Sequence, residues 1–261
     1  MTKIIAVANQ KGGVGKTTTC VNLAASLAAT RRSVLLIDMD PQGNATMGCG
    51  INKHEAEATA GAVMLREANV REAIVRSEEP GFDVLPGNDE LTAAEVTLLN
   101  EFGREVRLRQ ALEEIKDQYD YILIDCPPSL NMLTVNALTA ASSVLIPMQC
   151  EYYALEGLSA LITTIEQIRA AVNPDLEIEG IVRTMFDPRN NLANDVSNQL
   201  IMHFEEKVYN TVIPRNVRVA EAPSFGLPVL LHDKASRGAL AYLALAGEVN
   251  RRQGFPVRAT A

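Results

Sequence analysis

Tryptophan is missing from this sequence of 261 residues, and aromatic residues make up only 5% of it. The hydrophobic core must therefore be built mainly from Ala, Val, Leu and Ile. No apolar run approaches the roughly 20 residues that a membrane-spanning helix needs. The apolar run Ile4–Ala8 is too short for the hydrophobic part of a secretion signal, and it leads directly into polar residues. We therefore expect a cytoplasmic protein.

Cysteine and histidine are scarce and scattered. The four cysteines form no C-x-x-C pair, and the three histidines stand at no metal-ligand spacing. We interpret the thiols as reduced side chains that pack as small hydrophobic groups. The pattern assigns no metal or redox chemistry to these residues.

The charge is acidic overall but unevenly distributed. With 24 Lys and Arg against 32 Asp and Glu, the net charge is −8, which argues against a surface adapted throughout to nucleic acid. Residues 1–182 contain 14 basic and 25 acidic residues, whereas residues 183–261 contain 10 and 7. The C-terminal third therefore leaves room for a local anion-binding patch.

Short apolar runs alternate with segments of helical periodicity along the chain. Strands are expected at residues 3–8, 34–37, 82–85, 121–124, 143–148, 178–184 and 211–213. Helices are expected at residues 17–30, 105–116 and 239–250, with a long one ending near residue 172. This pattern predicts an α/β fold, a single-domain, doubly wound and mostly parallel sheet with helices on both faces. We expect one domain over residues 1–250 and a flexible tail over residues 251–261.

A glycine-rich segment follows the first expected strand and opens the first expected helix. Its glycines allow successive backbone N–H groups to point at phosphate oxygens, and the helix N-terminus adds positive potential. Lys16 is placed to reach the β- and γ-phosphates, and the Thr17 hydroxyl can ligate Mg²⁺. The segment predicts a P-loop with the nucleotide-binding residues Lys11, Gly12, Gly13, Val14, Gly15, Lys16, Thr17 and Thr18.

Three acidic residues follow expected strands on the same side of the sheet. Asp38, Asp40 and Asp125 would repel one another unless a cation lay among them, and bound Mg²⁺ would supply that cation. Asp125 suits the Walker B role, in which a carboxylate holds the metal through a water. We expect Asp38 to support the metal site from behind its direct ligands.

The segment K-G-G-V-G-K-T-T resembles the deviant Walker A signature of the ParA/MinD superfamily. Further segments are similar to its ParA (Soj-type) chromosome-partition branch, and the similarity extends over about residues 1–250. They are Asn9-Gln10, DMDPQGN at 38–44, IDCPPS at 124–129, TMFD at 184–187, IPRNVR at 213–218 and EAPS at 221–224. The sequence is identified as a member of this P-loop family, which implies a chromosome- or plasmid-partitioning ATPase that uses Mg²⁺ with ATP.

The resemblance implies roles for individual residues. Asp40 would position the attacking water, and Lys11 would contact the nucleotide of the partner subunit in an ATP sandwich dimer with Gly12 at its interface. Pro214 and Asn216 match the segment beside the adenine. The expected catalytic residues are Asp40, Lys11 and Lys16. Because one water-orienting carboxylate with no additional arginine finger gives little stabilisation of the transition state, we expect slow hydrolysis that a partner stimulates.

The resemblance also implies non-specific binding of double-stranded DNA by the ATP-bound dimer. Arg189 and Arg218 match positions that the family uses, and the neighbouring candidates are Arg215, Lys207, Lys234 and Arg237. No helix-turn-helix extension precedes the first strand, which is typical of the short type of partition ATPase. We therefore expect a ParB-like centromere-binding partner, no membrane binding, and association with the nucleoid when ATP is bound.

Three other functions compete with the interpretation as a partition ATPase. A MinD-type division-site regulator needs an amphipathic C-terminal helix, which Gly254 and Pro256 would break. An iron–sulfur reductase of the nitrogenase iron-protein type needs two cysteines at a dimer axis, and Cys126 and Cys150 stand in unsuitable contexts. A related ATPase that positions a different cargo stays open, because a partner surface selects the cargo.

Overall fold

An eight-stranded sheet forms the centre of the computed structural model, which describes residues 2–77, 79 and 81–255. The strand order is β3-β4-β2-β5-β1-β6-β7-β8, and all neighbours are parallel except β3 and β4. The strands are β1 Lys3–Val7, β2 Val34–Asp38, β3 Val75–Arg76, β4 Asp83–Leu85, β5 Tyr121–Asp125, β6 Ser143–Gln149, β7 Glu177–Phe186 and β8 Val208–Pro214.

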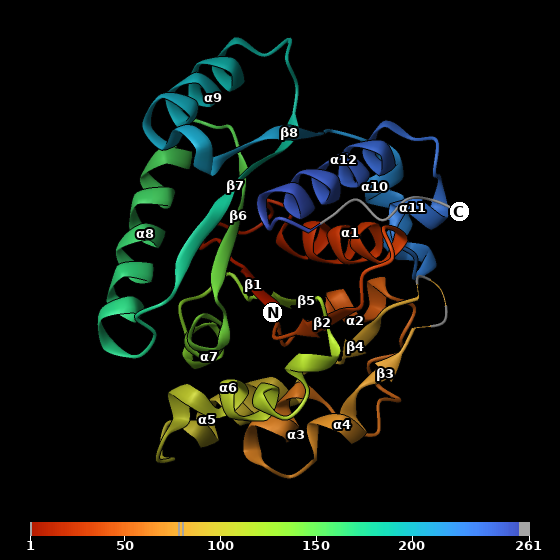
Figure 1. Cartoon of the computed structure of the whole chain (residues 1–261), viewed down its shortest axis with the longest axis vertical. Coiled ribbons are helices and arrows are strands. Elements are labelled where there is room, and N and C mark those ends of the chain that lie inside the picture. The colour runs from red at the N-terminus through yellow and green to blue at the C-terminus, as the bar shows by residue number, and fades with distance from the viewer. Residues whose placement is uncertain (1, 78, 80, 256–261) are drawn as a thin grey trace.

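Helices cover both faces of this sheet (Figure 1). They are α1 Lys16–Ala29, α2 Asn44–Gly48, α3 Ala60–Leu65, α4 Val70–Ala73, α5 Glu90–Leu98, α6 Arg107–Glu113, α7 Met132–Ala140, α8 Ala154–Ala171, α9 Asn191–Phe204, α10 Val217–Glu221, α11 Val229–His232 and α12 Arg237–Arg252. One buried cluster joins the sheet to α1 and α12, and a second joins it to α7 and α8. No helix in the described part of the chain is both long and apolar enough to cross a bilayer.

Strands β2 and β5, in the middle of the sheet, are buried along their whole length. Strands β2 (VLLID) and β5 (YILID) are apolar on both faces, as is typical of parallel strands between two helical layers. The predicted doubly wound fold is confirmed. The short helices between residues 44 and 98 were not predicted, because few of them carry a periodic apolar pattern, and α7 and α9 were missed as well.

The C-terminal boundary differs from the expected one. Helix α12 continues to Arg252, past the expected domain end at residue 250. The ring of Phe255 then lies 5.3 Å from the ring of Tyr121, between their centroids, at an angle of 57°. Burial of this contact explains why the chain stays against the body to residue 255. Residues 256–261, the rest of the expected tail, lie outside the described residues.

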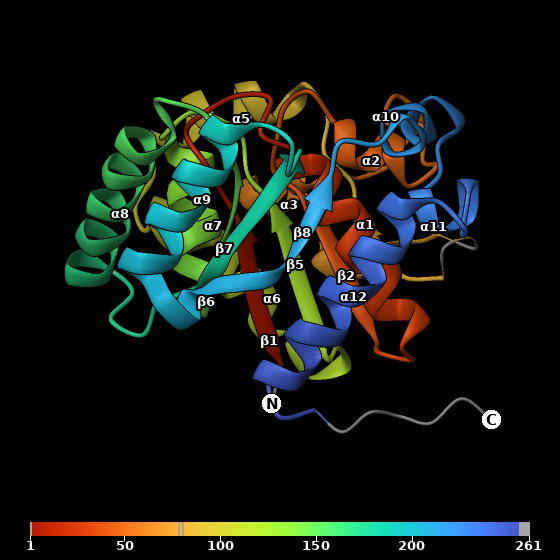
Figure 2. The same ribbon diagram turned by 90° about the horizontal axis from the view of Figure 1, so that it is seen from above.

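The fold brings the predicted site residues to one edge of the sheet. The carboxyl ends of the parallel strands all meet there, which Figure 2 shows by the common direction of the arrows β5, β7 and β8. Asp38 at the end of β2 is in register with Asp125 at the end of β5, and Asp125 is also in register with Val7. Ligands of open α/β sheets bind at this edge.

Candidate nucleotide-binding site

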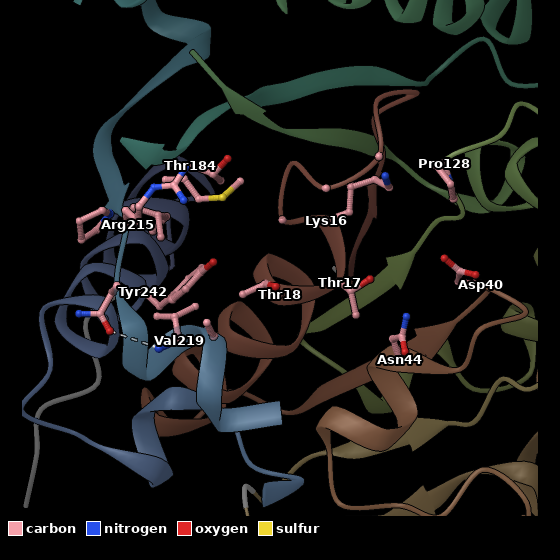
Figure 3. A pocket seen from close by; sticks show the side chains of 18 residues that line it. Lys16, Thr17, Thr18, Asp40, Asn44, Pro128, Thr184, Arg215, Val219 and Tyr242 are labelled. Carbon is pink, nitrogen blue, oxygen red and sulfur yellow. Dashed lines mark hydrogen bonds between the residues drawn. The ribbon is translucent and has the colours of Figure 1, made fainter. Parts of the chain in front are cut away.

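A cavity of about 420 Å³ opens at the carboxyl edge of the sheet. Figure 3 shows Lys16, Thr17, Asp40, Asn44 and Pro128 on one side of it, and Thr184, Arg215, Val219 and Tyr242 on the other. The remaining lining residues are Gly12, Gly13, Gly15, Thr18, Met185, Ile213, Pro214, Asn216 and Ala220. Segments from both ends of the sequence therefore form one site.

The phosphate loop has the backbone geometry that the glycines were expected to allow. Gly13 and Gly15 adopt left-handed conformations, with φ angles of 73° and 85°. The Lys16 side chain at the start of α1 is only 7% exposed, and its Nζ donates a hydrogen bond of 3.1 Å to the carbonyl of Lys11. Burial lowers the pKa of Lys16, and the nearby Asp125 carboxyl opposes that shift. An anion in the cavity would stabilise this buried ammonium group.

Lys11 is not among the residues that line the cavity. Its Nζ lies 2.5 Å from Oε2 of Glu151, in the turn between β6 and α8. Its backbone N–H donates to Oδ1 of Asn9, whose Nδ2 donates to the Pro147 carbonyl of β6. The loop is thus tied to β6 at its first residue. Glu151 was missed by the sequence analysis, since nothing local links two residues so far apart.

Asp38 and Asp125 are both fully buried behind the phosphate loop. Asp38 accepts hydrogen bonds from the amide and the hydroxyl of Thr46, at 2.8 and 2.7 Å, and from the amide of Asp40 at 3.1 Å. Neither oxygen of Asp125 accepts a hydrogen bond of ordinary geometry among the described residues, although the Thr17 hydroxyl is close enough to lower the pKa of this carboxyl. Asp38 is therefore held by three hydrogen bonds to the loop that follows β2, whereas Asp125 is a buried acid whose only polar neighbour of this kind is Thr17 at the start of α1.

Burial raises the pKa values of both acids. The pKa of Asp38 rises to about 6, although the hydrogen bonds from Thr46 lower it in part. Burial raises the pKa of Asp125 well above its ordinary value, and the negative charge of Asp38 adds to this, while the Thr17 hydroxyl and Lys16 act in the opposite direction. Two adjacent buried carboxyls with raised pKa values are characteristic of a site that accepts a cation.

Asp40 lies on the wall of the cavity. It is half-buried, and its Oδ1 accepts a hydrogen bond of 3.0 Å from the Gln42 amide. Thr17 and Asn44 line the same side (Figure 3). The second carboxylate oxygen of Asp40 has no hydrogen bond within the described residues, so it is available to a water.

The opposite side of the cavity is mainly apolar. Asn216 caps α10, because its Oδ1 accepts a hydrogen bond of 3.2 Å from the Val219 amide. Its Nδ2 has no partner among the described residues and can donate to a ligand. Tyr242 closes the floor, where its hydroxyl lies 3.3 Å from that of Thr19. Tyr242 was not singled out from the sequence.

The three arginines proposed for DNA binding are placed differently. Arg189 is highly exposed and pairs twice with Asp187, from Nε at 2.9 Å and from Nη2 at 2.8 Å. Arg218 pairs with Glu221 at 2.9 Å and with Asp233 at 3.5 Å. Arg215 lines the nucleotide cavity instead (Figure 3).

The basic candidates do not all lie at the same edge of the sheet. Phe186 of β7 and Pro214 of β8 are in register, so the segments of Arg189 and Arg218 both leave the carboxyl edge from neighbouring strands. Lys207, by contrast, donates to the carbonyl of Ile178 near the start of β7. It therefore lies at the opposite edge and does not join a patch with Arg189, which corrects its expected placement.

Comparison with known proteins shows which family the chain resembles. A family model described as an AAA domain matches residues 2–178. The chromosome partitioning protein ParA of Caulobacter vibrioides is 54% identical over 96% of this chain and 95% of its own length. The sporulation initiation inhibitor protein Soj of Bacillus subtilis is also 54% identical, over 95% and 98%.

A solved structure shares the fold and carries a nucleotide. Cobyrinic acid a,c-diamide synthase from Mycobacterium smegmatis, with bound ADP and magnesium, is 36% identical over 100% of this chain and 99% of its own, with a TM-score of 0.85. The fold of this chain is therefore one that holds magnesium and a nucleotide in that relative.

Proposed function

This chain belongs to the family of ParA and Soj chromosome-partitioning ATPases, and from that premise we propose that MgATP drives it into a dimer that binds DNA without sequence preference. ATP hydrolysis would return it to a free monomer. A ParB-like partner would set the rate of that return.

The first step is binding of MgATP in the cavity. The observation that carries it is the fully buried carboxyl of Asp125, which lies beside the Thr17 hydroxyl and behind a glycine loop that also holds the buried Lys16. Thr17 lies on the cavity wall, where its hydroxyl would ligate the metal directly, and Asp125 would hold it through a water. The residues therefore fit Mg²⁺, which when bound would neutralise phosphate charge.

The metal site needs ligands from outside the protein. Among residues 2–77, 79 and 81–255, no group of three or more His, Cys, Asp or Glu side chains is placed to hold a metal by itself. Mg²⁺ usually completes its shell with phosphate oxygens and waters, so this arrangement suits a metal that arrives with its nucleotide. Asp38 would act through its hydrogen bonds to Thr46 and Asp40, which fix the loop after β2.

The second step is hydrolysis. Asp40, on the cavity wall, would orient a water toward the γ-phosphate, while Lys16 and the loop N–H groups would bind the charge that develops on its oxygens. Lys11 would add a further cation only after leaving Glu151. A monomer whose Lys11 is paired with Glu151 should therefore hydrolyse ATP slowly.

The third step is dimerisation, in which Gly12 would lie at the interface. Gly12 is exposed, and a Cβ added to it would meet no atom within 4 Å. A side chain at this position therefore costs the monomer nothing in packing, while it would project into an opposing subunit. We therefore expect the Gly12→Val variant to fold normally but to fail to dimerise.

The fourth step is DNA binding. Arg189 and Arg218 both follow strands that end at the carboxyl edge, and a dimer would bring two sets of them onto one surface. Contacts of this kind neutralise phosphates and carry no base readout. The acidic protein would therefore bind DNA as a dimer but not as a monomer.

The experiment is direct binding of the purified protein to duplex DNA of arbitrary sequence, with ADP, ATP or a non-hydrolysable ATP analogue, at about 50 and about 200 mM salt. We expect salt-sensitive binding in the ATP-like states, and its loss in Arg218→Ala and Gly12→Val. Gly12→Val should keep the melting temperature of wild type, since a Cβ at this position meets no atom within 4 Å. DNA binding that does not depend on the nucleotide, or no DNA binding, would refute the DNA step. The protein would then be an ATPase of this family that acts on something other than DNA.

A further inference from the structure

A single buried hydroxyl joins strand β7 to the phosphate loop. Oγ1 of Thr184 donates a hydrogen bond of 2.7 Å to the carbonyl oxygen of Val14. Thr184 is 2% exposed and Val14 is 1% exposed, so water does not compete for either group. The loop follows β1, and β6 lies between β1 and β7 in the sheet. The hydrogen bond therefore holds the loop from two strands away.

The geometry of the peptide unit gives this contact a consequence for the ligand. The Val14 carbonyl and the Gly15 N–H belong to one planar trans peptide, so they point in opposite directions. Thr184 draws the carbonyl toward β7, and the N–H must then face the other way. Gly15 lines the cavity, and its N–H has no hydrogen-bond partner within the described residues.

This peptide would otherwise have considerable freedom. Gly13 and Gly15 flank Val14, both with positive φ, and glycine adopts either sign of φ with little cost. A loop of this composition does not fix the direction of its own N–H groups. An external contact is needed to do so before a ligand arrives, and the methyl of Thr184 also lies 3.9 Å from the position of a Cβ on Gly15.

Strand β7 is shaped to present Thr184 at this point. Arg183 is in register with Val212 and Phe186 with Pro214, so β7 uses one more residue than β8 between these pairs. Met185 lies in this bulge with a φ of 48°, an uncommon conformation for a residue other than glycine. Consecutive residues Thr184 and Met185 therefore both line the cavity.

The strand is anchored just before the bulge. The Arg183 guanidinium donates to the hydroxyl of Ser197 at 2.9 Å and to the carbonyl of Tyr209 at 2.8 Å. Since Arg183 is fixed on one side, the irregular backbone that follows it is held in place. Unfavourable backbone conformations that persist in this way are concentrated at functional sites.

We propose that Thr184 is a positioning residue of the phosphate loop, whose hydroxyl fixes the Val14–Gly15 peptide so that the Gly15 N–H donates to a phosphate oxygen of the nucleotide. The inference rests on the nucleotide occupying the cavity as proposed above. It assigns the TMFD segment a part in nucleotide binding that lies outside the loop itself. Thr184 touches the loop and acts through it.

The test compares Thr184→Val, which keeps the shape and loses the hydroxyl, with Thr184→Ser, which keeps the hydroxyl. We expect Thr184→Val to bind MgADP and MgATP about ten- to a hundredfold more weakly, as for loss of a hydrogen bond to a charged group, and Thr184→Ser to stay within about threefold of wild type. Thr184→Ala, which also lacks the hydroxyl, should reproduce the loss if the valine variant folds poorly.

Thr2→Val is the matched control. In the wild type, the Thr2 hydroxyl donates a hydrogen bond of the same length, 2.7 Å, to the Lys116 carbonyl at the opposite edge of the sheet. The variant should leave nucleotide affinity unchanged. In two-dimensional NMR spectra, the Gly15 amide signal should move on adding MgADP to wild type and to Thr184→Ser, and should move much less in Thr184→Val.

The outcomes separate the positioning role from other readings. Wild-type affinity in Thr184→Val and Thr184→Ala, or equal losses in the valine and serine variants, would overturn the role of the hydroxyl while leaving the nucleotide site intact. A lower melting temperature in Thr184→Val with unchanged affinity would assign the hydrogen bond to stability alone. If wild type itself bound no MgADP, the nucleotide site would fall, and the inference with it.

Discussion

The ammonium group of Lys11 lies 2.5 Å from Oε2 of Glu151 in the same chain, so the free monomer already supplies this lysine with an anionic partner. Their side chains are 39% and 46% exposed. Solvent screens the pair, which makes it weak enough to exchange. Lys11 therefore has to leave one anion before it can contact another.

Glu151→Gln should favour ATP-dependent dimerisation, because it removes the charge that competes for Lys11. A surface ion pair of this kind contributes about 0.2–1 kcal/mol, so the ATP concentration at half-maximal dimer should fall by a factor of about 1.5 to 5. Light scattering coupled to size-exclusion chromatography measures the change. Glu113→Gln is the control, since Glu113 pairs with Lys116 at 2.6 Å far from the cavity. A requirement for more ATP would contradict the competition.

Asp187→Asn should strengthen DNA binding. The Arg189 guanidinium holds the pKa of Asp187 down at about 2, so this carboxylate is charged at any working pH and occupies the arginine. Releasing Arg189 should raise the affinity of the ATP-bound protein for DNA several-fold and steepen its salt dependence by about 0.9 for each additional phosphate contact.

The control for this variant removes an equal charge elsewhere. Asp175→Asn alters an exposed acid just before β7, at the opposite edge of the sheet. It should change affinity less than Asp187→Asn does. Equal effects of the two variants would show that net charge acts alone and that Arg189 is not restrained.

Asp125→Asn should stabilise the nucleotide-free protein at alkaline pH. Because burial raises the pKa of Asp125, its native state binds a proton more tightly than the unfolded chain, and stability falls as pH rises from about 4 through the native pKa. The variant should melt higher than wild type at about pH 8, by roughly 2–4 °C for each kcal/mol recovered. It should also lose most of the stabilisation that MgADP gives.

Thermal unfolding at about pH 6 and about pH 8, with and without MgADP, checks this expectation. The pKa of Asp38, raised by burial to about 6, adds a loss of stability with the same sign over the lower part of this range. Asp175→Asn again serves as the exposed control. A variant that melts lower than wild type at alkaline pH would show that the Asp125 charge is compensated in the free protein.

Asn216→Asp should weaken nucleotide binding and leave the fold intact. Aspartate caps a helix as well as asparagine does, so the hydrogen bond to the Val219 amide is kept, but the Nδ2 donor is lost. We expect ATP affinity to fall several-fold with little change in melting temperature. Asn190→Asp is matched, because Asn190 caps α9 through the Ala193 amide. Unchanged ATP affinity in Asn216→Asp would exclude a contact from this amide to the base.

The sequence predicted the parts of the site that are local in the chain. The sequence of residues 3–30 predicted a strand, a glycine turn and a helix in that order. The parallel sheet predicted that the acids at the ends of β2 and β5 would lie on the same side of it. Gly13 and Gly15 have the positive φ angles that the motif requires. These features depend on neighbours a few residues away, which a single sequence displays.

The parts that were not predicted depend on distant pairs. Thr184 and Val14 are 170 positions apart, and Lys11 and Glu151 are 140 apart. The bulge at Met185 arises from the register between β7 and β8, which no local pattern encodes. Arg215 was expected as a neighbour of Arg189 and Arg218 in a DNA-binding patch, and in the structure it lines the cavity.

The cavity is lined by segments that lie far apart in the sequence. Residues 12–18 contribute to one side and residues 213–220 to the other, so a bound nucleotide would join segments separated by most of the sequence. Such a ligand would act as a reversible cross-link and restrain the ends of a very long loop. Loss of nucleotide would then loosen the docking of α10 to α12 before it affected the central strands, and protease cleavage should begin there.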